Sequence, residues 1–208
     1  MSIKSFLMLV VPVFFLSSLN FASNPSVKSQ TTENLKAALI GETTASAKYA
    51  AYAKKAEDEG YKNIALLFKA ASKSESIHAG NHRAALEQLN VKTDKIEPNY
   101  EVKTTKENLQ DAIKGESYEV ATMYPDFIKK ANEEKVNIAM LSLNYAYQTE
   151  KEHKVMYQNA LEKLNAGKED TMASKYMVCS TCGNTYDGEA PARCGISMTP
   201  KDRFYIIQ

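Results

Sequence analysis

The 208-residue sequence has little cysteine, no tryptophan and almost no net charge. Its three cysteines all fall between positions 179 and 194, which is too few and too local for a disulfide framework and indicates a small metal-binding knuckle instead. The formal net charge of +1 gives no basic footprint for a nucleic acid and no electrostatic docking to a membrane. We therefore expect a globular protein with one sizeable domain, a small appendage and no nucleic-acid partner.

Long hydrophobic runs are also scarce, and the most apolar one lies near the N-terminus. Lys4 precedes an apolar run over residues 6–16, which is short for a bilayer span and is interrupted by Pro12. This pattern favours a secretory signal peptide over 1–22 rather than an uncleaved anchor, which is the alternative. We expect a flexible mature N-terminus over 23–30, no membrane span in the mature protein, and export to the periplasm.

Histidine is scarce as well, and two of the three histidines stand three residues after a glutamate. These pairs are Glu75 with His78, and Glu150 with His153. Any single pair of this kind is most simply a surface ion pair. Two pairs at corresponding places in the chain form a more specific pattern.

The chain resembles itself at an offset of about 74 residues. Glu42 and Glu116, each preceded by glycine, stand 74 positions apart, and residues 63–65 match residues 137–139 at the same offset. The two Glu-x-x-His pairs are 75 positions apart. A duplicated helical hairpin is the simplest account.

Apolar stripes with the helical period predict four helices, over 31–58, 61–90, 105–133 and 136–165. The stretch 91–103 contains Pro98, carries no stripe and is expected to cross over between the two hairpins. Thr104, followed three residues later by Glu107, predicts a capping box at the start of the third helix. We therefore expect an all-α four-helix bundle over 31–166.

Ionisable residues interrupt the apolar stripes of all four predicted helices. The glutamates are Glu42, Glu75, Glu116, Glu119 and Glu150. Because a buried carboxylate without a partner costs several kcal/mol, such a set needs cations among it. Residues i and i+3 share a helical face, so each Glu-x-x-His pair can present an oxygen and a nitrogen to one centre. The pattern predicts a dinuclear metal site inside the bundle.

Four neighbouring residues have less certain roles. Glu119 has no counterpart in the first half and is predicted to be a seventh ligand, with a surface position as the alternative. His82 follows His78 by one helical turn and is expected to pack or support the site rather than bind metal. Tyr49 and Tyr124 are core aromatics on this reading, and Tyr49 could also approach the metals.

A polar linker over 167–175 leads to a separate C-terminal unit over 176–208. Cys179 and Cys182 form one Cys-x-x-Cys knuckle, but in the second knuckle Cys194 is followed by Ser197 instead of cysteine. A three-thiolate site that recruits the Ser197 oxygen or water could hold one Fe or Zn. The alternative is an empty site with a disulfide between Cys179 and Cys182.

Taken together, residues 30–208 resemble rubrerythrin. The markers are Gly41-Glu42, the two Glu-x-x-His pairs, Gly115-Glu116-x-x-Glu119 followed by Met123-Tyr124-Pro125, and the tail with Cys179, Cys182-Gly183, Ala190-Pro191, Cys194, Pro200-Lys201 and Phe204. The resemblance implies a ferritin-like bundle followed by a rubredoxin-like domain. It implies a non-haem di-iron peroxidase that reduces hydrogen peroxide to water.

The resemblance also implies roles for individual residues. One iron would be bound by Glu42, Glu75 and His78, and the other by Glu116, Glu150 and His153, with Glu75 and Glu150 as bridges. Glu119 would replace His78 as a ligand of the first iron in the oxidised state. Tyr49 and Tyr124 would donate hydrogen bonds to the ligating glutamates.

Electron supply is where the sequence departs from the family. In rubrerythrins the rubredoxin iron supplies the electrons, usually across a head-to-tail homodimer, and the proteins are mostly cytoplasmic. Here Ser197 replaces the fourth cysteine and the protein is expected to be exported. The electron donor is therefore unidentified. Two other functions stay open: a ferroxidase that oxidises ferrous iron, and an iron-binding protein without turnover.

Overall fold

The computed structural model describes residues 29–208, so the predicted signal peptide over 1–22 and most of the predicted N-terminal segment over 23–30 lie outside the described residues. The first helix, α1 (Gln30–Asp58), begins where the Ser29 side chain accepts a hydrogen bond from the backbone N–H of Thr32. Within the described part of the chain, no helix is long and apolar enough to cross a membrane.

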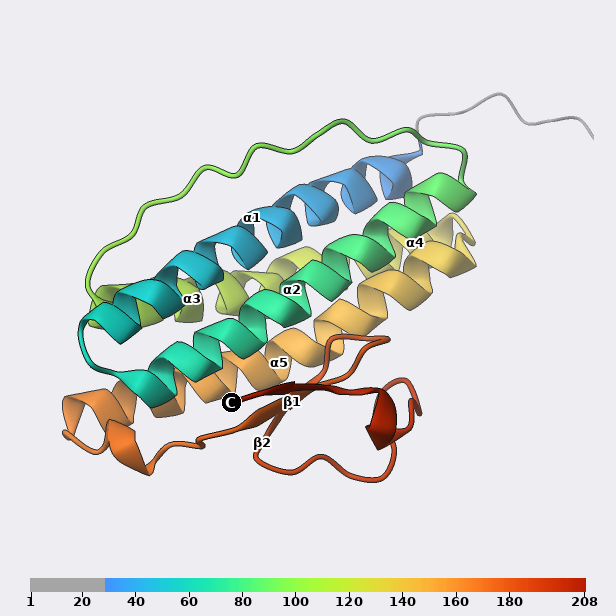
Figure 1. Cartoon of the computed structure of the whole chain (residues 1–208). Coiled ribbons are helices and arrows are strands. Elements are labelled where there is room, and N and C mark those ends of the chain that lie inside the picture. The colour runs from blue at the N-terminus through green and yellow to red at the C-terminus, as the bar shows by residue number, and fades with distance from the viewer. Residues whose placement is uncertain (1–28) are drawn as a thin grey trace, which may run out of the picture.

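The helices form two hairpins that face each other. After α1 come α2 (Lys62–Gln88), α3 (Thr105–Tyr118), α4 (Tyr124–Glu133) and α5 (Asn137–Asn165). The first hairpin is α1 packed on α2, and the second packs α3 and α4 on α5. The connection between them runs as an extended segment along the outside of the bundle (Figure 1). This arrangement confirms the predicted four-helix bundle.

The capping box at the start of α3 forms as predicted. The Thr104 side chain accepts a hydrogen bond from the backbone N–H of Glu107, and the Glu107 carboxylate accepts one from the backbone N–H of Thr104. Two of the backbone donors at this end of the helix are satisfied in this way, so α3 has a sharply defined beginning.

The third helix is interrupted, which corrects the prediction of one continuous helix over 105–133. Residues Glu119–Met123 (η1) form a π-helical turn between α3 and α4. Glu42 and Tyr49 are seven positions apart, whereas Glu116 and Tyr124 are eight positions apart. The wider π turn takes up the extra residue, so Tyr124 reaches the interior as Tyr49 does.

The π turn also changes the register of the repeat. Beyond it, equivalent positions are 75 residues apart: α2 begins at Lys62 and α5 at Asn137, and the turn residues with positive φ are Gly60 and Lys135. The predicted match of residues 63–65 with 137–139 at an offset of 74 is therefore out of step by one residue.

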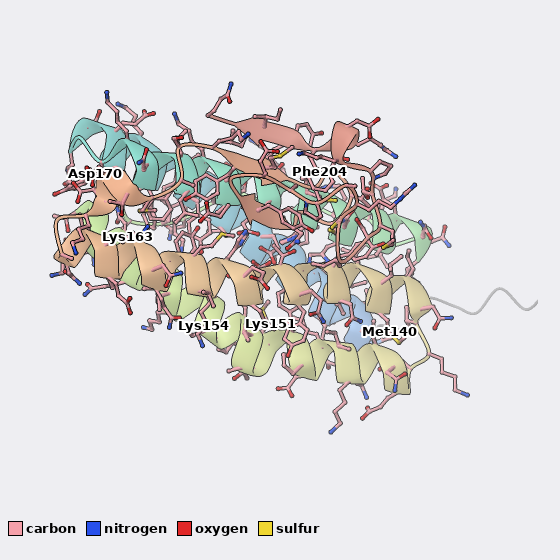
Figure 2. All side chains as sticks on the ribbon, turned by 90° about the horizontal axis from the view of Figure 1, so that it is seen from below. Met140, Lys151, Lys154, Lys163, Asp170 and Phe204 are labelled. Atoms are coloured by element: carbon pink, nitrogen blue, oxygen red, sulfur yellow. The ribbon has the colours of Figure 1, made fainter. Side chains whose placement is uncertain are left out.

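The C-terminal unit is a small antiparallel sheet. Its strands are β1 (Tyr176–Val178), β2 (Thr185–Asp187) and β3 (Tyr205–Ile207), in the order β2-β1-β3, with short 3-10 turns η2 (Glu169–Thr171) and η3 (Lys201–Arg203). The sheet packs against α2 and α5. Figure 2 shows Phe204 in this unit on one side of α5, with Lys154 and Lys163 along that helix. The sheet and the three cysteines fit a rubredoxin-like domain.

The bundle has two apolar clusters with a polar layer between them. One cluster gathers around Phe68 and Tyr157, and the other around Leu86 and Leu143. On α2 the first cluster ends at Ala71 and the second begins beyond His78, so the Glu-x-x-His pair lies between them. The apolar clusters on both sides hold the four helices at a spacing that leaves the polar layer buried.

Candidate metal centre

Four of the five helices, all except α4, deliver candidate metal-ligand side chains to the polar layer. These side chains are each exposed by 2% or less: Glu42 on α1, Glu75 and His78 on α2, Glu116 on α3, and Glu150 and His153 on α5. They form two overlapping groups whose ligand atoms lie within 4.8 Å of one another. The first group is Glu42, Glu75, His78 and Glu150, and the second is Glu75, Glu116, Glu150 and His153.

Glu75 and Glu150 connect the two groups. The Nδ1 atom of His78 lies 2.8 Å from one oxygen of Glu75 and 2.8 Å from one oxygen of Glu150. The Nδ1 atom of His153 lies 3.1 Å and 2.8 Å from the other oxygens of the same two carboxylates. Each carboxylate therefore turns one oxygen toward each histidine, which is the arrangement of a bridging ligand.

Within residues 29–208 the ligand atoms of this layer make no hydrogen bond of good geometry, although each histidine Nδ1 lies close to two carboxylate oxygens. The ligand atoms are Glu42 Oε2, Glu116 Oε2, both oxygens of Glu75 and of Glu150, and Nδ1 of His78 and of His153. Leaving a buried polar group unpaired costs about 1–3 kcal/mol, and more when it is charged. Two cations between these atoms would remove that cost, so the donor set fits a dinuclear centre with carboxylate and imidazole ligands.

The protonation behaviour of the layer reflects the same crowding. Burial, followed by the nearby carboxylates, raises the pKa of Glu42 and of Glu116 well above 4.5. Burial also raises the pKa of Glu150, but His78 and His153 outweigh it and lower this pKa to about 2. Burial lowers the pKa of His153, and Glu75 with Glu150 raises it to about 9. Without cations, the layer therefore holds protons in their place.

Two tyrosines connect each hairpin to a carboxylate of the other hairpin. The Tyr49 hydroxyl donates to Glu116 Oε1 at 2.7 Å, and the Tyr124 hydroxyl donates to Glu42 Oε1. Each bond uses one oxygen and leaves Oε2 without a partner. The predicted tyrosine–glutamate hydrogen bonds are therefore present in this geometry, and each glutamate offers one free oxygen to a metal.

Glu119 is set apart from the other candidates. It begins the π turn, is only partly buried and does not belong to either group of ligand atoms within 4.8 Å. Burial, then Glu150 and Glu75, raises the pKa of Glu119 well above 4.5, so it lies within the electrostatic field of the layer. In this structure His78 occupies the ligand position that Glu119 was predicted to share.

The outer nitrogens of both histidines contact the C-terminal unit. Nε2 of His78 lies 2.9 Å from the backbone carbonyl oxygen of Cys182, and Nε2 of His153 lies 2.9 Å from the hydroxyl of Thr185. Both are acceptors for an Nε2–H donor, since Thr185 gives its own proton to Gly183. When a metal displaces the second proton, each ring keeps Nε2–H in this hydrogen bond and presents Nδ1 to the metal.

Gly183 allows this close approach. Its φ is +80°, and a Cβ atom there would lie 2.5 Å from His78 Nε2 and 2.7 Å from Ser74 Oγ. The Ser74 hydroxyl donates to the Gly183 carbonyl at 2.7 Å. Sequence reasoning missed this contact and the role of Thr185. The one available signal was a glycine directly after a ligand-type cysteine.

The three cysteines also come together. Cys179, Cys182 and Cys194 are buried, carry no disulfide and have sulfur atoms within 4.8 Å of one another. Ser197 Oγ lies 3.3 Å from Cys179 Sγ. A hydrogen bond from Cys182 lowers the pKa of Cys179 to about 4, which favours the thiolate form that binds metal. The group could bind a metal ion.

Comparisons with known proteins agree with this geometry. The rubrerythrin family model matches residues 33–161. Nigerythrin from Nitratidesulfovibrio vulgaris is 37% identical over 191 residues, which cover 88% of this chain and 89% of that protein. Rubrerythrin-2 from Clostridium acetobutylicum is 34% identical over 181 residues, which cover 86% of this chain and 98% of that protein.

The folds agree as well. A solved structure of nigerythrin in a mixed-valence state matches with a TM-score of 0.78 at 37% sequence identity. The match covers 89% of this chain and 90% of that one. It extends beyond the bundle, because the bundle alone would make up a smaller share of either chain.

Proposed function

We propose that this chain, which belongs to the rubrerythrin family, reduces hydrogen peroxide to water at a non-haem di-iron centre. Family membership makes it a di-iron protein of oxidative-stress defence and an oxidoreductase in general terms. The observation that carries the finer proposal is the buried layer of unpartnered carboxylate oxygens and histidine nitrogens. Such a layer is costly in a protein that does not bind cations there.

The two overlapping groups of side chains suggest how the irons are held. Glu42 and His78 would bind one iron, Glu116 and His153 the other, and both Glu75 and Glu150 would bridge them. When bound, two ferrous ions supply the two electrons that peroxide reduction needs and polarise the substrate as Lewis acids. The remaining work falls to the protein, which must bring protons and exclude bulk water.

Tyrosines and Glu119 have separate tasks in this proposal. The hydroxyls of Tyr49 and Tyr124 orient the terminal glutamates and keep one oxygen of each toward the metals. Glu119, in the π turn, is the partly buried carboxylate outside the two ligand groups, and it would exchange with His78 between redox states. A π turn suits that task because π-helical segments are frequent at functional sites.

Electrons would enter through the C-terminal unit. The backbone carbonyl of Cys182 is hydrogen-bonded to His78. Cys182 would therefore link a metal held by the three cysteines directly to a ligand of the di-iron centre. We propose Ser197 as the fourth ligand of that metal. The upstream donor is unidentified, and a periplasmic location and a homodimer remain part of the proposal.

The decisive test of the reaction is oxidation of the anaerobic di-ferrous protein, followed by stopped-flow absorption. One equivalent of hydrogen peroxide is expected to oxidise both irons, much faster than oxygen does. Oxygen reacting as fast as peroxide would favour a ferroxidase and overturn the proposal. Absence of reaction with either oxidant would favour iron binding without turnover.

The C-terminal site has its own test, which uses absorption of the purified iron-loaded protein. A ferric thiolate band is expected in the unmodified chain, and it should shift in Ser197→Cys because a fourth thiolate replaces an oxygen ligand. A band that is absent from the unmodified chain and appears only in Ser197→Cys would show that Ser197 does not complete a site.

A further inference from the structure

Beyond the metal layer, a chain of buried polar side chains runs from Glu42 to α5. The Tyr124 hydroxyl donates to Glu42 Oε1, and His82 Nε2 lies 3.4 Å from the Tyr124 oxygen. On the far side of the ring, His82 Nδ1 lies 2.7 Å from Ser142 Oγ. Tyr124 and His82 are fully buried and Ser142 is 4% exposed, so bulk water cannot replace these partners.

The hydrogen bonds in this series all run in one direction, from Ser142 toward Glu42. As an ionised metal ligand, Glu42 can only accept, so Tyr124 must give it its single hydroxyl proton. The Tyr124 oxygen can then only accept from His82 Nε2–H. With its Nε2–H donating to Tyr124, the buried neutral His82 ring accepts from the Ser142 hydroxyl at Nδ1.

The other hairpin lacks this series of hydrogen bonds. The residue equivalent to His82 is Tyr157, which follows His153 by four positions as His82 follows His78. The Tyr157 hydroxyl has no hydrogen-bond partner within residues 29–208, and its ring packs edge-on against Tyr49 with centroids 5.5 Å apart. The residue behind Tyr49 is therefore a phenol that, after burial and the ligating glutamate, raises the pKa of Tyr49, and among the described residues it has no imidazole or serine behind it.

We propose that His82 is a positioning residue for Glu42, locking the Tyr124 hydroxyl onto Oε1 so that Oε2 is the single metal-binding oxygen. This inference rests on the proposed role of Glu42 as a ligand. It follows that the two metal positions are unequal, because only the tyrosine that holds Glu42 has a histidine and a serine behind it. Loss of a hydrogen-bond partner behind a ligand typically weakens metal binding about 10- to 100-fold.

The test is a Co²⁺ titration of the full-length metal-free protein, followed by visible absorption, with zinc blocking the C-terminal site beforehand. His82→Leu is expected to weaken one of the two binding steps about tenfold and to spare the other. His82→Gln, whose amide can still donate, should weaken it less. The matched control is Tyr157→Phe at the equivalent position of the other hairpin, which should spare the step that responds to His82.

A double variant separates positioning from general disruption. If His82 acts through Tyr124, then Tyr124→Phe with His82→Leu should bind Co²⁺ as Tyr124→Phe alone does. Additive losses would overturn the inference, and so would equal weakening of both steps or no weakening in His82→Leu. Should His82→Leu fail to fold, Ser142→Ala removes only the outer hydrogen bond and is expected to weaken the same step by a smaller factor.

The readout also distinguishes this inference from the proposed function. Unequal Co²⁺ steps that respond to His82, in a protein that does not react with peroxide, would leave the inference standing and overturn the peroxidase. Peroxide reduction by a protein whose Co²⁺ binding does not depend on His82 would support the peroxidase and overturn the inference.

Discussion

In the first hairpin Glu42 and Tyr49 lie on one regular helix, whereas in the second hairpin a π turn separates Glu116 from Tyr124. The two hairpins contribute the same types of candidate ligand, one glutamate and one Glu-x-x-His pair each. Their surroundings differ, because Glu119 occurs only in the second hairpin and His82 only in the first. The two hairpins therefore share the groups that would touch metal and differ in the groups behind them.

The largest effect is expected from removing a carboxylate that serves both metal positions. Glu75→Ala and Glu150→Ala are each expected to lose both metals, since each carboxylate faces both histidines. Affinity should fall by more than about 100-fold, beyond the loss caused by an outer partner alone. Metal content after dialysis measures the effect. Glu152→Ala, an exposed neighbour, should keep both metals, and loss of only one metal in either variant would contradict bridging.

The contact between the C-terminal unit and the first hairpin depends on Gly183. In Gly183→Ala the new Cβ would meet His78 and adopt an unfavourable φ of +80°. Thermal unfolding should reveal a loss of stability larger than the roughly 1–2 kcal/mol that a left-handed residue costs by itself.

Gly188→Ala is the matched control for this glycine. Gly188 also has a positive φ, +75°, but nothing lies within 4 Å of its Cβ position. Gly188→Ala should therefore lose only the roughly 1–2 kcal/mol of stability that the left-handed conformation costs. Equal losses in the two variants would show that the close approach to His78 contributes nothing to stability.

Removing the metals should make the stability of the protein depend on pH. The raised pKa values of Glu42, Glu116 and Glu119 stabilise the fold below pH 4.5, and this contribution is lost as pH rises through them. His153, with its pKa of about 9, behaves in the same direction. Glu150, with its pKa lowered to about 2, stabilises the fold above pH 4.5 and loses this contribution toward pH 2.

The melting temperature of the metal-free protein is therefore expected to fall between about pH 5 and pH 9. Scanning calorimetry of the metal-free and metal-loaded proteins measures the difference. The metal-loaded protein should change much less, because cations compensate the ionised carboxylates. A metal-free melting temperature that rises over this range would contradict the electrostatic account of the layer.

The smallest expected effect distinguishes the two histidines. His78 donates to a backbone carbonyl, which no substitution removes, whereas His153 donates to the Thr185 hydroxyl. Thr185→Val should weaken one metal-binding step up to about tenfold and leave the other intact. Ser74→Ala is the control, as it removes another hydroxyl of the same interface. A similar change in both variants would point to the interface rather than to His153.

Much of the site could be predicted from the sequence because helices impose a strict geometry. Glu75 and His78 had to share a face, and apolar residues on both sides of them required that face to be buried. The π turn was foreshadowed by the change of offset between the halves, but no local residue pattern marked it. The predicted continuous third helix was wrong for that reason.

The sequence by itself determined the helices of the bundle, the two Glu-x-x-His pairs and the Cys179-x-x-Cys182 knuckle, since each follows from spacing along one helix or one short loop. Only the tertiary structure decided that Cys182 and Thr185 meet the two histidines, that His82 lies behind Tyr124, and that Glu119 stands outside the ligand groups. The physical reason is that these contacts join segments far apart in the chain. One of them, between His78 and Cys182, uses a backbone carbonyl, which every residue has and no sequence pattern reveals.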